Sequence, residues 1–181
     1  MGNTRKIPQT IQNLIGEVGE GLVLFKLYEL CQDSKKLEVF KNYSEPGYDC
    51  GIRIMDPLKK GKSDKVKIEV KARQRLISVS ESKNSAHFTL TENERKCADF
   101  LVGYWLEYNH FFIVPVNDLN KVKSGEKDGK AKYVYKHIAT RSASKKVKFE
   151  SEIDRYTQKS HGYFDKWDLI LEEIKLRRLE K

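Results

Sequence analysis

Residues 48–71, YDCGIRIMDPLKKGKSDKVKIEVK, decide the fold. Between residues 65 and 71 apolar side chains alternate with charged ones, which is the two-residue period of a strand with one buried face. Residues 48–55 favour a second strand, and the polar run 56–64 that begins with Asp-Pro has the composition of a turn or loop. We therefore predict an antiparallel hairpin.

Three polar side chains of this hairpin are placed to share one site. Glu69 and Lys71 are two residues apart, so they project from the same side of the sheet. Antiparallel pairing brings Asp49 and Glu69 together near the open end. Two converging carboxylates suit a hard divalent cation such as Mg²⁺, and a neighbouring lysine can orient a water or stabilise charge on a phosphate. A Glu-x-Lys triplet alone is common on solvated strands. The presence of Asp49 on the preceding strand is what makes the triplet indicate a site.

A long helix is expected before the hairpin, from Gln9 to Cys31. Apolar residues recur there at steps of three and four, as one face of a helix requires; they are Ile11, Leu14, Ile15, Val18, Leu22, Phe25 and Tyr28. Gly16, Gly19 and Gly21 would each cost about 1 kcal/mol of helix propensity relative to alanine, so they suggest close approach of another backbone.

The remaining elements can be read in the same way. Short strands are expected at 37–41, 76–80 and 86–90, an antiparallel pair at 102–108 and 111–116, and a later strand at 133–138. Thr91 and Glu94 form a capping box that opens a short second helix. Helical spacing returns at 164–179. The expected class is α/β with a central mixed sheet, in one domain over residues 1–181, with a core at about 9–120 and a C-terminal extension at about 121–181.

Positive charge is concentrated in two segments of the chain. The net charge is +9. Residues 59–75 carry eight basic and two acidic residues, and residues 121–148 carry ten basic and two acidic, so the two segments hold +6 and +8 and the remainder holds −5. Such segments can neutralise phosphates and release counterions, which indicates a nucleic-acid partner, although lysine-rich loops can also be merely solvated.

Several other classes of protein fit poorly. A charged fraction of 34% and a mean hydropathy of −0.66 argue against a membrane protein, and no apolar leader is seen near Met1, so a cytoplasmic location is expected. The three cysteines and four histidines are too scattered to predict a disulfide framework or a zinc site. No phosphate-binding G-x-x-x-x-G-K-[ST] loop is present, so no nucleotide cofactor is expected.

The residues of the predicted hairpin resemble the motif of a known family. Gly47-Tyr48-Asp49 followed by Ile68-Glu69-Val70-Lys71-Ala72 resembles the PD-(D/E)XK nuclease superfamily, and residues 88–98 and 111–116 resemble its Mrr-like and NO VEIN C-terminal-type branch. The likeness covers roughly residues 16–116, and Tyr48 stands where the motif has proline. It implies a restriction endonuclease-like αβββαβ core, to which this chain adds a C-terminal strand and helix.

The resemblance also implies an activity and roles for particular residues. The expected activity is that of a Mg²⁺-dependent DNA endonuclease, with Mn²⁺ as a substitute metal and restriction or defence as the setting. Asp49 and Glu69 would bind the metal and Lys71 would act on the attacking water. Glu20, on the helix before the core, would support the metal, with Glu17 as the second match. The alternatives are a Holliday-junction resolvase-like nuclease and a DNA-binding module without catalysis.

Two further expectations concern partners. DNA phosphates are expected to contact the basic segments, specifically Lys59, Lys60, Lys62, Arg73, Arg75, Lys130 and Lys132. A double-strand cut would most simply use a homodimer, because one site cuts one strand. The apolar stripe of residues 164–179 is either the dimer interface or part of the domain's own core.

Overall fold

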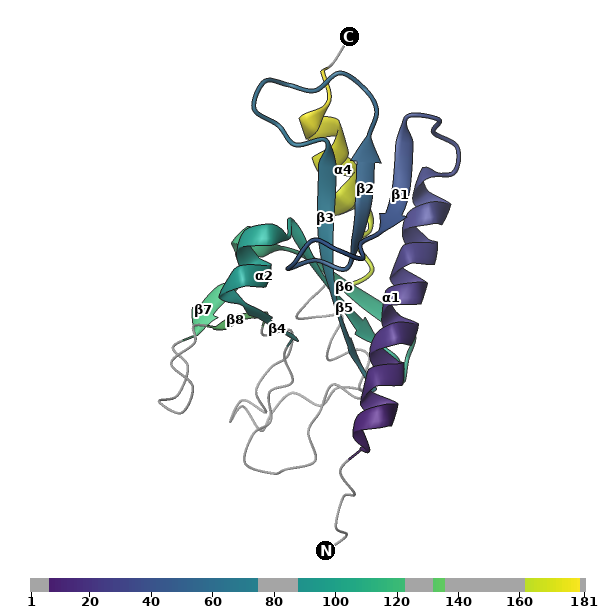
Figure 1. The fold of residues 1–181 in the computed structure, drawn as a ribbon, viewed down its shortest axis with the longest axis vertical. Helices are drawn as coiled ribbons and strands as arrows, with labels where there is room; N and C mark the ends of the chain where they lie inside the picture. The colour runs from purple at the N-terminus through teal and green to yellow at the C-terminus, as the bar shows by residue number, and fades with distance from the viewer. Residues whose placement is uncertain (1–6, 75–87, 123–131, 136–161, 180–181) are drawn as a thin grey trace, which may run out of the picture.

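The computed structural model describes residues 7–74, 88–122, 132–135 and 162–179 (Figure 1). The element order is α1 (Gln9–Cys31), β1 (Leu37–Lys41), β2 (Cys50–Ile54), β3 (Lys65–Arg73), β4 (Phe88–Thr91), α2 (Glu92–Cys97), β5 (Phe100–Trp105), β6 (His110–Pro115), the 3-10 turn η1 (Val116–Asp118), β7 (Asn120–Val122), β8 (Lys132–Tyr135) and α4 (Asp168–Arg177). The expected strand at 76–80 and most of the basic loop after 121 lie outside the described residues.

The strands form two sheets. The central sheet has the order β1-β2-β3-β5-β6, and β4, β8 and β7 form a smaller one. β3 and β5 pair in parallel, whereas β1–β2, β2–β3 and β5–β6 are antiparallel. The expected mixed α/β class, both hairpins and the αβββαβ order are therefore confirmed, with β4 added between β3 and α2.

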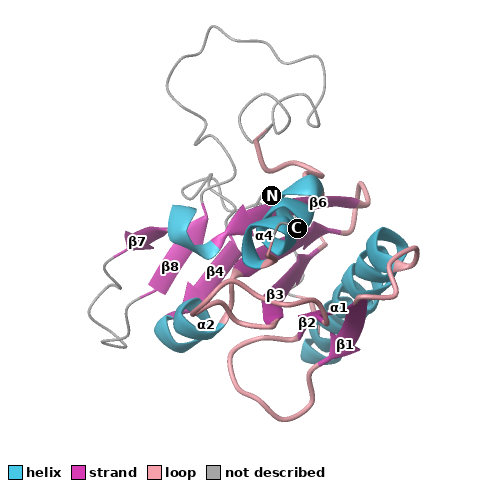
Figure 2. Cartoon of the chain, turned by 90° about the horizontal axis from the view of Figure 1, so that it is seen from above, coloured by secondary structure: helices cyan, strands magenta, loops and turns pink. Residues whose placement is uncertain are grey.

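Each face of the central sheet buries its own apolar cluster. Alternate residues of β3, such as Ile68, pack with α1 and α4 on one face. On the other face, residues such as Leu101 and Trp105 pack against Phe88 and Leu90 of the smaller sheet. Viewed from above, α1 and the smaller sheet lie at opposite sides of the molecule (Figure 2). Side chains alternate between the two faces along a strand, so Glu69 and Lys71 project from the face opposite to Ile68. That is the side of the sheet where α2 lies.

Helix α1 has the expected bounds, but a different face of it is buried. Its fully packed residues are Gly19, Val23, Leu27 and Cys31. The stripe used to predict the helix is largely exposed, including Leu14, Phe25 and Tyr28. The helix is apolar on two sides, so periodicity located the helix without identifying which side meets the sheet.

One of the three helix glycines makes the expected close contact. A Cβ on Gly19 would lie 2.6 Å from the Cβ of Ala72 on β3, whereas nothing lies within 4 Å of a Cβ on Gly16 or Gly21. The expectation of close approach is therefore correct for Gly19 and wrong for the other two. Gly19 lets α1 lie directly on β3, next to the predicted site.

This contact predicts opposite effects for two alanine substitutions in one helix. Gly19→Ala should destabilise the fold by about 1–3 kcal/mol, because an added methyl would overlap Ala72. Gly16→Ala should stabilise it by about 1 kcal/mol through helix propensity alone. Urea unfolding of the two variants checks this. Equal effects of the two substitutions would contradict the packing of Gly19 on β3.

Helix α4 is part of the domain's own core. Ile170 and Ile174 are fully packed, and buried Arg177 binds Glu173 and Asp99, each at 2.7 Å. Arg177 also donates to the backbone oxygen of Lys65. Of the two expected uses of the 164–179 stripe, the structure favours the core. In the part of the chain described, no helix has the length and apolar character needed to cross a membrane.

Candidate active site

Asp49 lies immediately before β2, where the β2–β3 ladder ends. Its backbone N–H donates to the carbonyl of Ile68 at 2.9 Å, and Cys50 is paired with the same residue. Two residues further along β3, the N–H of Val70 donates to Oδ2 of Asp49 at 2.7 Å. The carboxylate thus takes the place of a backbone acceptor in the ladder, which fixes it beside Glu69.

The loop that delivers Asp49 depends on Gly47. Its φ of +86° lies in the left-handed region, and a Cβ there would lie 2.7 Å from the Cβ of Cys97 on α2. Both observations require glycine. Asn42 closes the same loop, since its side-chain amide donates to the carbonyl of Tyr48 at 2.7 Å and its N–H donates to the carbonyl of Asp49 at 2.8 Å.

Glu69, Lys71 and Glu94 form a network that runs from β3 to α2. The ammonium of Lys71 donates to Oε1 of Glu69 and, at 3.0 Å, to Oε1 of Glu94. The other oxygen of Glu94 accepts from the N–H of Thr91 at 2.6 Å, and Thr91 Oγ1 accepts from the N–H of Glu94 at 3.2 Å. The capping box expected from the sequence is present, and it also holds the partner of Lys71.

Glu94 is the residue of this site that sequence reasoning missed. The sequence pattern of Thr91 and Glu94 indicates only a helix cap. The signal that could have found Glu94 is its place on the helix that enters β5, because β5 lies next to β3 in the sheet. That pairing joins residues far apart in the sequence, and the spacing of residues alone does not predict it.

Burial disfavours the charged forms of Asp49 and Glu69. Burial, with a smaller contribution from Asp49, raises the pKa of Glu69 from 4.5 to about 7, although Lys71 opposes the shift. Only 5% of Glu69 is exposed. Burial and the nearby charge of Glu20 also raise the pKa of Asp49, against the stabilising hydrogen bond from Val70.

Lys71 is charged in this setting. Burial alone would lower its pKa, but Glu69 and Glu94 outweigh that effect and leave the pKa raised. Burial also works against the ionised form of Glu94, yet the hydrogen bond from Thr91 and the contact with Lys71 lower its pKa overall. The site therefore gathers Asp49, Glu69 and Glu94 around a single lysine and is negative on a chain of net charge +9.

Glu20 lies near this group without joining it. Its carboxylate is 3.3 Å from the ammonium of Lys41, and its charge reaches Asp49. Glu17 is exposed on α1, so Glu20 is the better placed of the two helix carboxylates. Among the described residues, no three His, Cys, Asp or Glu side chains gather closely enough to form a complete metal site. The protein itself thus offers two adjacent carboxylates, from Asp49 and Glu69.

The basic residues expected to contact DNA are only partly near the site. Lys59, Lys60 and Lys62 lie in the loop at the closed end of the hairpin, and β3 advances about 13 Å between its start at Lys65 and Glu69. The structure does not bring these three lysines to the carboxylates, because they belong to opposite ends of the hairpin.

The other expected contacts lie on β3 or beyond it. Arg73, at the end of β3, is exposed, and its guanidinium lies 5.9 Å from the ring centroid of Phe88. Lys132 begins β8, while Arg75 and Lys130 fall outside the described residues. Two further candidates, which are not among the residues expected from the sequence, are Lys65 and Lys67, and Lys67 is only two residues from Glu69. They share the polar side of β3 with Glu69, and both approach Glu45, at 2.6 and 3.6 Å.

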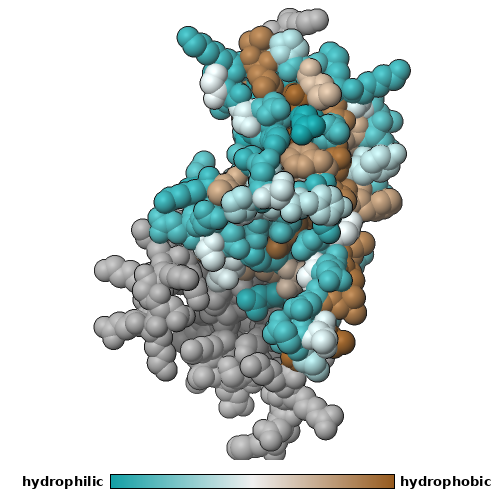
Figure 3. Space-filling view, in the orientation of Figure 1, coloured by the Kyte–Doolittle hydropathy of each residue, from teal (hydrophilic) through white to brown (hydrophobic). Residues whose placement is uncertain are grey.

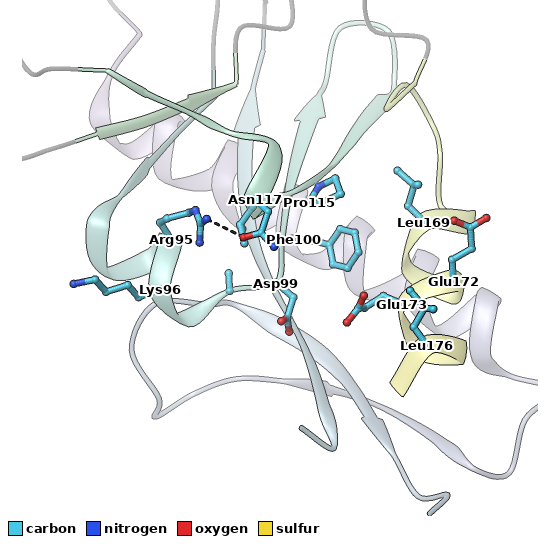
Figure 4. Close-up of a pocket in the computed structure, with 12 residues that line it drawn as sticks. Arg95, Lys96, Asp99, Phe100, Pro115, Asn117, Leu169, Glu172, Glu173 and Leu176 are labelled. Atoms are coloured by element: carbon cyan, nitrogen blue, oxygen red, sulfur yellow. Dashed lines mark hydrogen bonds between the residues drawn. The ribbon is translucent and has the colours of Figure 1, made fainter. Parts of the chain in front are cut away.

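A separate pocket of about 420 Å³ lies between α2, the ends of β5 and β6, and α4 (Figure 4). Its lining mixes signs, with Arg95 and Lys96 on one side and Glu172 and Glu173 on the other. Asp99 in its wall binds the N–H of Lys67 and the side chain of Arg177. Asp49, Glu69 and Lys71 are not among its lining residues, and Asp99 and Glu173 in its wall both bind Arg177 of α4.

Comparison with known proteins gives a likeness to solved structures but not to known sequences. No protein-family model and no curated protein sequence matches the chain. Among solved structures, the chain is similar to the bacterial homing endonuclease I-Ssp6803I, with a TM-score of 0.49 and 18% identity over 97% of this chain and 96% of that one. At this level of similarity, the roles of the site residues rest on this chain's own geometry.

Proposed function

We propose that the chain is a divalent-cation-dependent deoxyribonuclease of the PD-(D/E)XK type, which hydrolyses phosphodiester bonds in restriction or defence. The observation that carries this proposal is the placement of Asp49 beside Glu69 and Lys71. The Val70 N–H holds the Asp49 carboxylate against β3, and Lys71 is charged and held between Glu69 and Glu94. A negatively charged site suits a bound cation, and the basic chain around it suits the phosphates of DNA.

The residues present fit Mg²⁺ or Mn²⁺. Asp49 and Glu69 offer hard oxygen ligands. Burial disfavours their ionised carboxylates, and a bound cation would offset that cost. Mg²⁺ is commonly bound through one or two carboxylates, waters and substrate phosphates, so two protein ligands are sufficient. Asp49 and Glu69 would hold the ion, and Glu20 would support its water shell. When bound, the ion favours hydroxide formation from water and neutralises charge on the scissile phosphate.

The remaining chemistry belongs to the side chains. Lys71 can donate a hydrogen bond to the attacking water or to a phosphate oxygen, and its fixed charge favours the more negative transition state. Glu94 orients Lys71, and the capping box in turn orients Glu94. The near-complete burial of Glu69 keeps the negative charges in a setting where electrostatic interactions are stronger than in water.

The activity can be tested on four DNA substrates. The protein is incubated with supercoiled plasmid, linear duplex, single strand and four-way junction, each with Mg²⁺, Mn²⁺ or a chelator. We expect cleavage of duplex DNA with either metal and none with the chelator. Cutting confined to the junction would favour the resolvase alternative. Salt-dependent binding without cleavage of any substrate would favour a non-catalytic DNA-binding module and overturn the nuclease proposal.

Binding to duplex DNA should weaken steeply with salt. If about six phosphates are neutralised, log K should fall against log[salt] with a slope of roughly −5. Lys67→Ala should reduce the slope by about 1 if that lysine, on the polar side of β3, contacts a phosphate. Fluorescence anisotropy with a labelled duplex, in chelator to prevent cleavage, measures both. A slope near zero would contradict an electrostatic DNA interface.

A further inference from the structure

Helix α1 carries an apolar stripe that faces solvent. Ile11, Leu14, Val18, Phe25 and Tyr28 are each between 39% and 58% exposed. Figure 3 shows hydrophobic residues along the edge of the molecule where α1 runs. The face that packs on the sheet lies on the other side of the helix. Isolated exposed apolar residues are ordinary, but a continuous row of them marks an interaction surface.

The spacing of the stripe is that of a paired helix. Ile11, Val18 and Phe25 are seven residues apart, and so are Leu14, Gly21 and Tyr28. These two sets are offset by three residues, which is the a and d pattern of a heptad repeat, whose period keeps one seam facing a second helix. Gly21 lies in open space, so a neighbouring helix can approach closely there.

The size of the stripe is adequate for a stable contact. A helix of 23 residues is about 34 Å long. The five exposed side chains, with Ile7 just before the helix, present on the order of 500 Å² of apolar surface if a whole large side chain offers about 180 Å². A standard interface covers about 800 Å² per partner, of which somewhat more than half is apolar.

We propose that α1 is the surface through which two copies of this chain associate, helix against helix about a two-fold axis. A membrane surface is a less suitable partner for α1, because helices that lie on membranes carry Lys and Arg on their polar face. In α1 the charged residues are Glu17, Glu20, Lys26 and Glu29, and Lys26 is already bound to Glu29 at 2.7 Å. The side chains of the stripe itself carry no charge.

The arrangement has a consequence for the candidate active site. Gly19 and Glu20 lie on the same helix as the stripe, on the side that faces β3 and Asp49. Pairing through α1 would therefore fix the relative positions of the two sites through a single rigid element in each copy. The inference about association does not depend on the proposed nuclease activity.

The test measures mass in solution, without DNA or divalent metal. In sedimentation velocity at tens of micromolar, the wild-type chain should have twice its monomer mass of 21.1 kDa. Leu14→Glu and Phe25→Glu should weaken association by at least about 100-fold, because each would bury two uncompensated charges in the seam. Leu176→Glu is the matched control, since that leucine is 59% exposed on α4, and it should remain dimeric. Circular dichroism should show all three variants folded, since the replaced side chains are exposed.

Three results would overturn the proposal. A monomeric wild-type chain would mean that the stripe pairs with something other than a second copy. A dimer that persists in both α1 variants would place the interface elsewhere. Loss of the dimer only in Leu176→Glu would assign it to α4. Because none of these measurements involves cleavage, a failed association test leaves the nuclease proposal standing, and a failed cleavage test leaves the association proposal standing.

Discussion

Glu69→Gln is expected to abolish metal-dependent cleavage of DNA while stabilising the metal-free fold above neutral pH. Glutamine keeps the shape of the side chain but removes the ligand charge. Loss of charge neutralisation and of nucleophile formation should reduce turnover by at least about 10³-fold. The same change removes a buried carboxylate that is unfavourable when ionised.

The sign and size of the stability effect follow from the pKa of Glu69. Its folded-state pKa of about 7 lies above the ordinary value of 4.5. The contribution of Glu69 to stability is therefore fully present below pH 4.5 and is lost as the pH rises through 7. The loss is about 3 kcal/mol for a shift of this size. Near pH 8 the glutamine variant should be more stable than the wild type by up to that amount, with little difference near pH 4.

Urea unfolding in chelator, at the two pH values, measures this. Glu38→Gln is the matched control, because Glu38 is an exposed carboxylate of the same sheet, paired with Arg53 at 2.9 Å. Added Mg²⁺ should stabilise the wild type and the control but not Glu69→Gln. A Glu69→Gln variant no more stable than wild type near pH 8 would contradict the burial of an ionised Glu69.

Lys71→Met is expected to separate catalysis from binding. Methionine is close in length and removes the ammonium, so Glu69 and Glu94 lose their shared partner. Turnover should fall by about 10²- to 10³-fold, because one preorganised donor to the reacting groups is lost. Cation binding should persist or tighten, since the site becomes more negative, and affinity for duplex DNA should remain within a few-fold.

Cleavage rates, Mn²⁺ titration calorimetry and anisotropy on one preparation give these three quantities. Lys96→Met is a suitable control, because Lys96 lies on α2 and its ion pair with Glu92 is exposed. Unchanged turnover in Lys71→Met would remove Lys71 from the mechanism. Loss of cation binding together with turnover would instead assign Lys71 a structural role in holding Glu69.

The hairpin and the position of Asp49 beside β3 could be predicted because the information is local. The alternation from Lys65 to Lys71 defines which side of β3 is polar, and antiparallel pairing of the adjacent strand brings Asp49 to Glu69. Neighbouring residues likewise determine the bounds of α1 and β1 and the capping box of α2. These expectations agree with the structure.

The remaining features depend on packing between distant elements. Both sides of α1 are apolar, and only its position on β3 decides that Val23 and Leu27 are buried while Phe25 is exposed. The contact of Glu94 with Lys71 requires the parallel pairing of β3 with β5. Lys59, Lys60 and Lys62 are near Asp49 in sequence, but the length of the hairpin separates them from it.

The assignment of Asp49 and Glu69 as ligands of a catalytic metal can be tested on one duplex DNA substrate. Its cleavage is measured with purified wild type, Asp49→Asn, Glu69→Gln and Glu38→Gln, in Mg²⁺ and in chelator. Wild type and Glu38→Gln should cut only when Mg²⁺ is present. Asp49→Asn and Glu69→Gln should stay folded and bind DNA without cutting it. Full Mg²⁺-dependent cleavage by either Asp49→Asn or Glu69→Gln would contradict the assignment of this site.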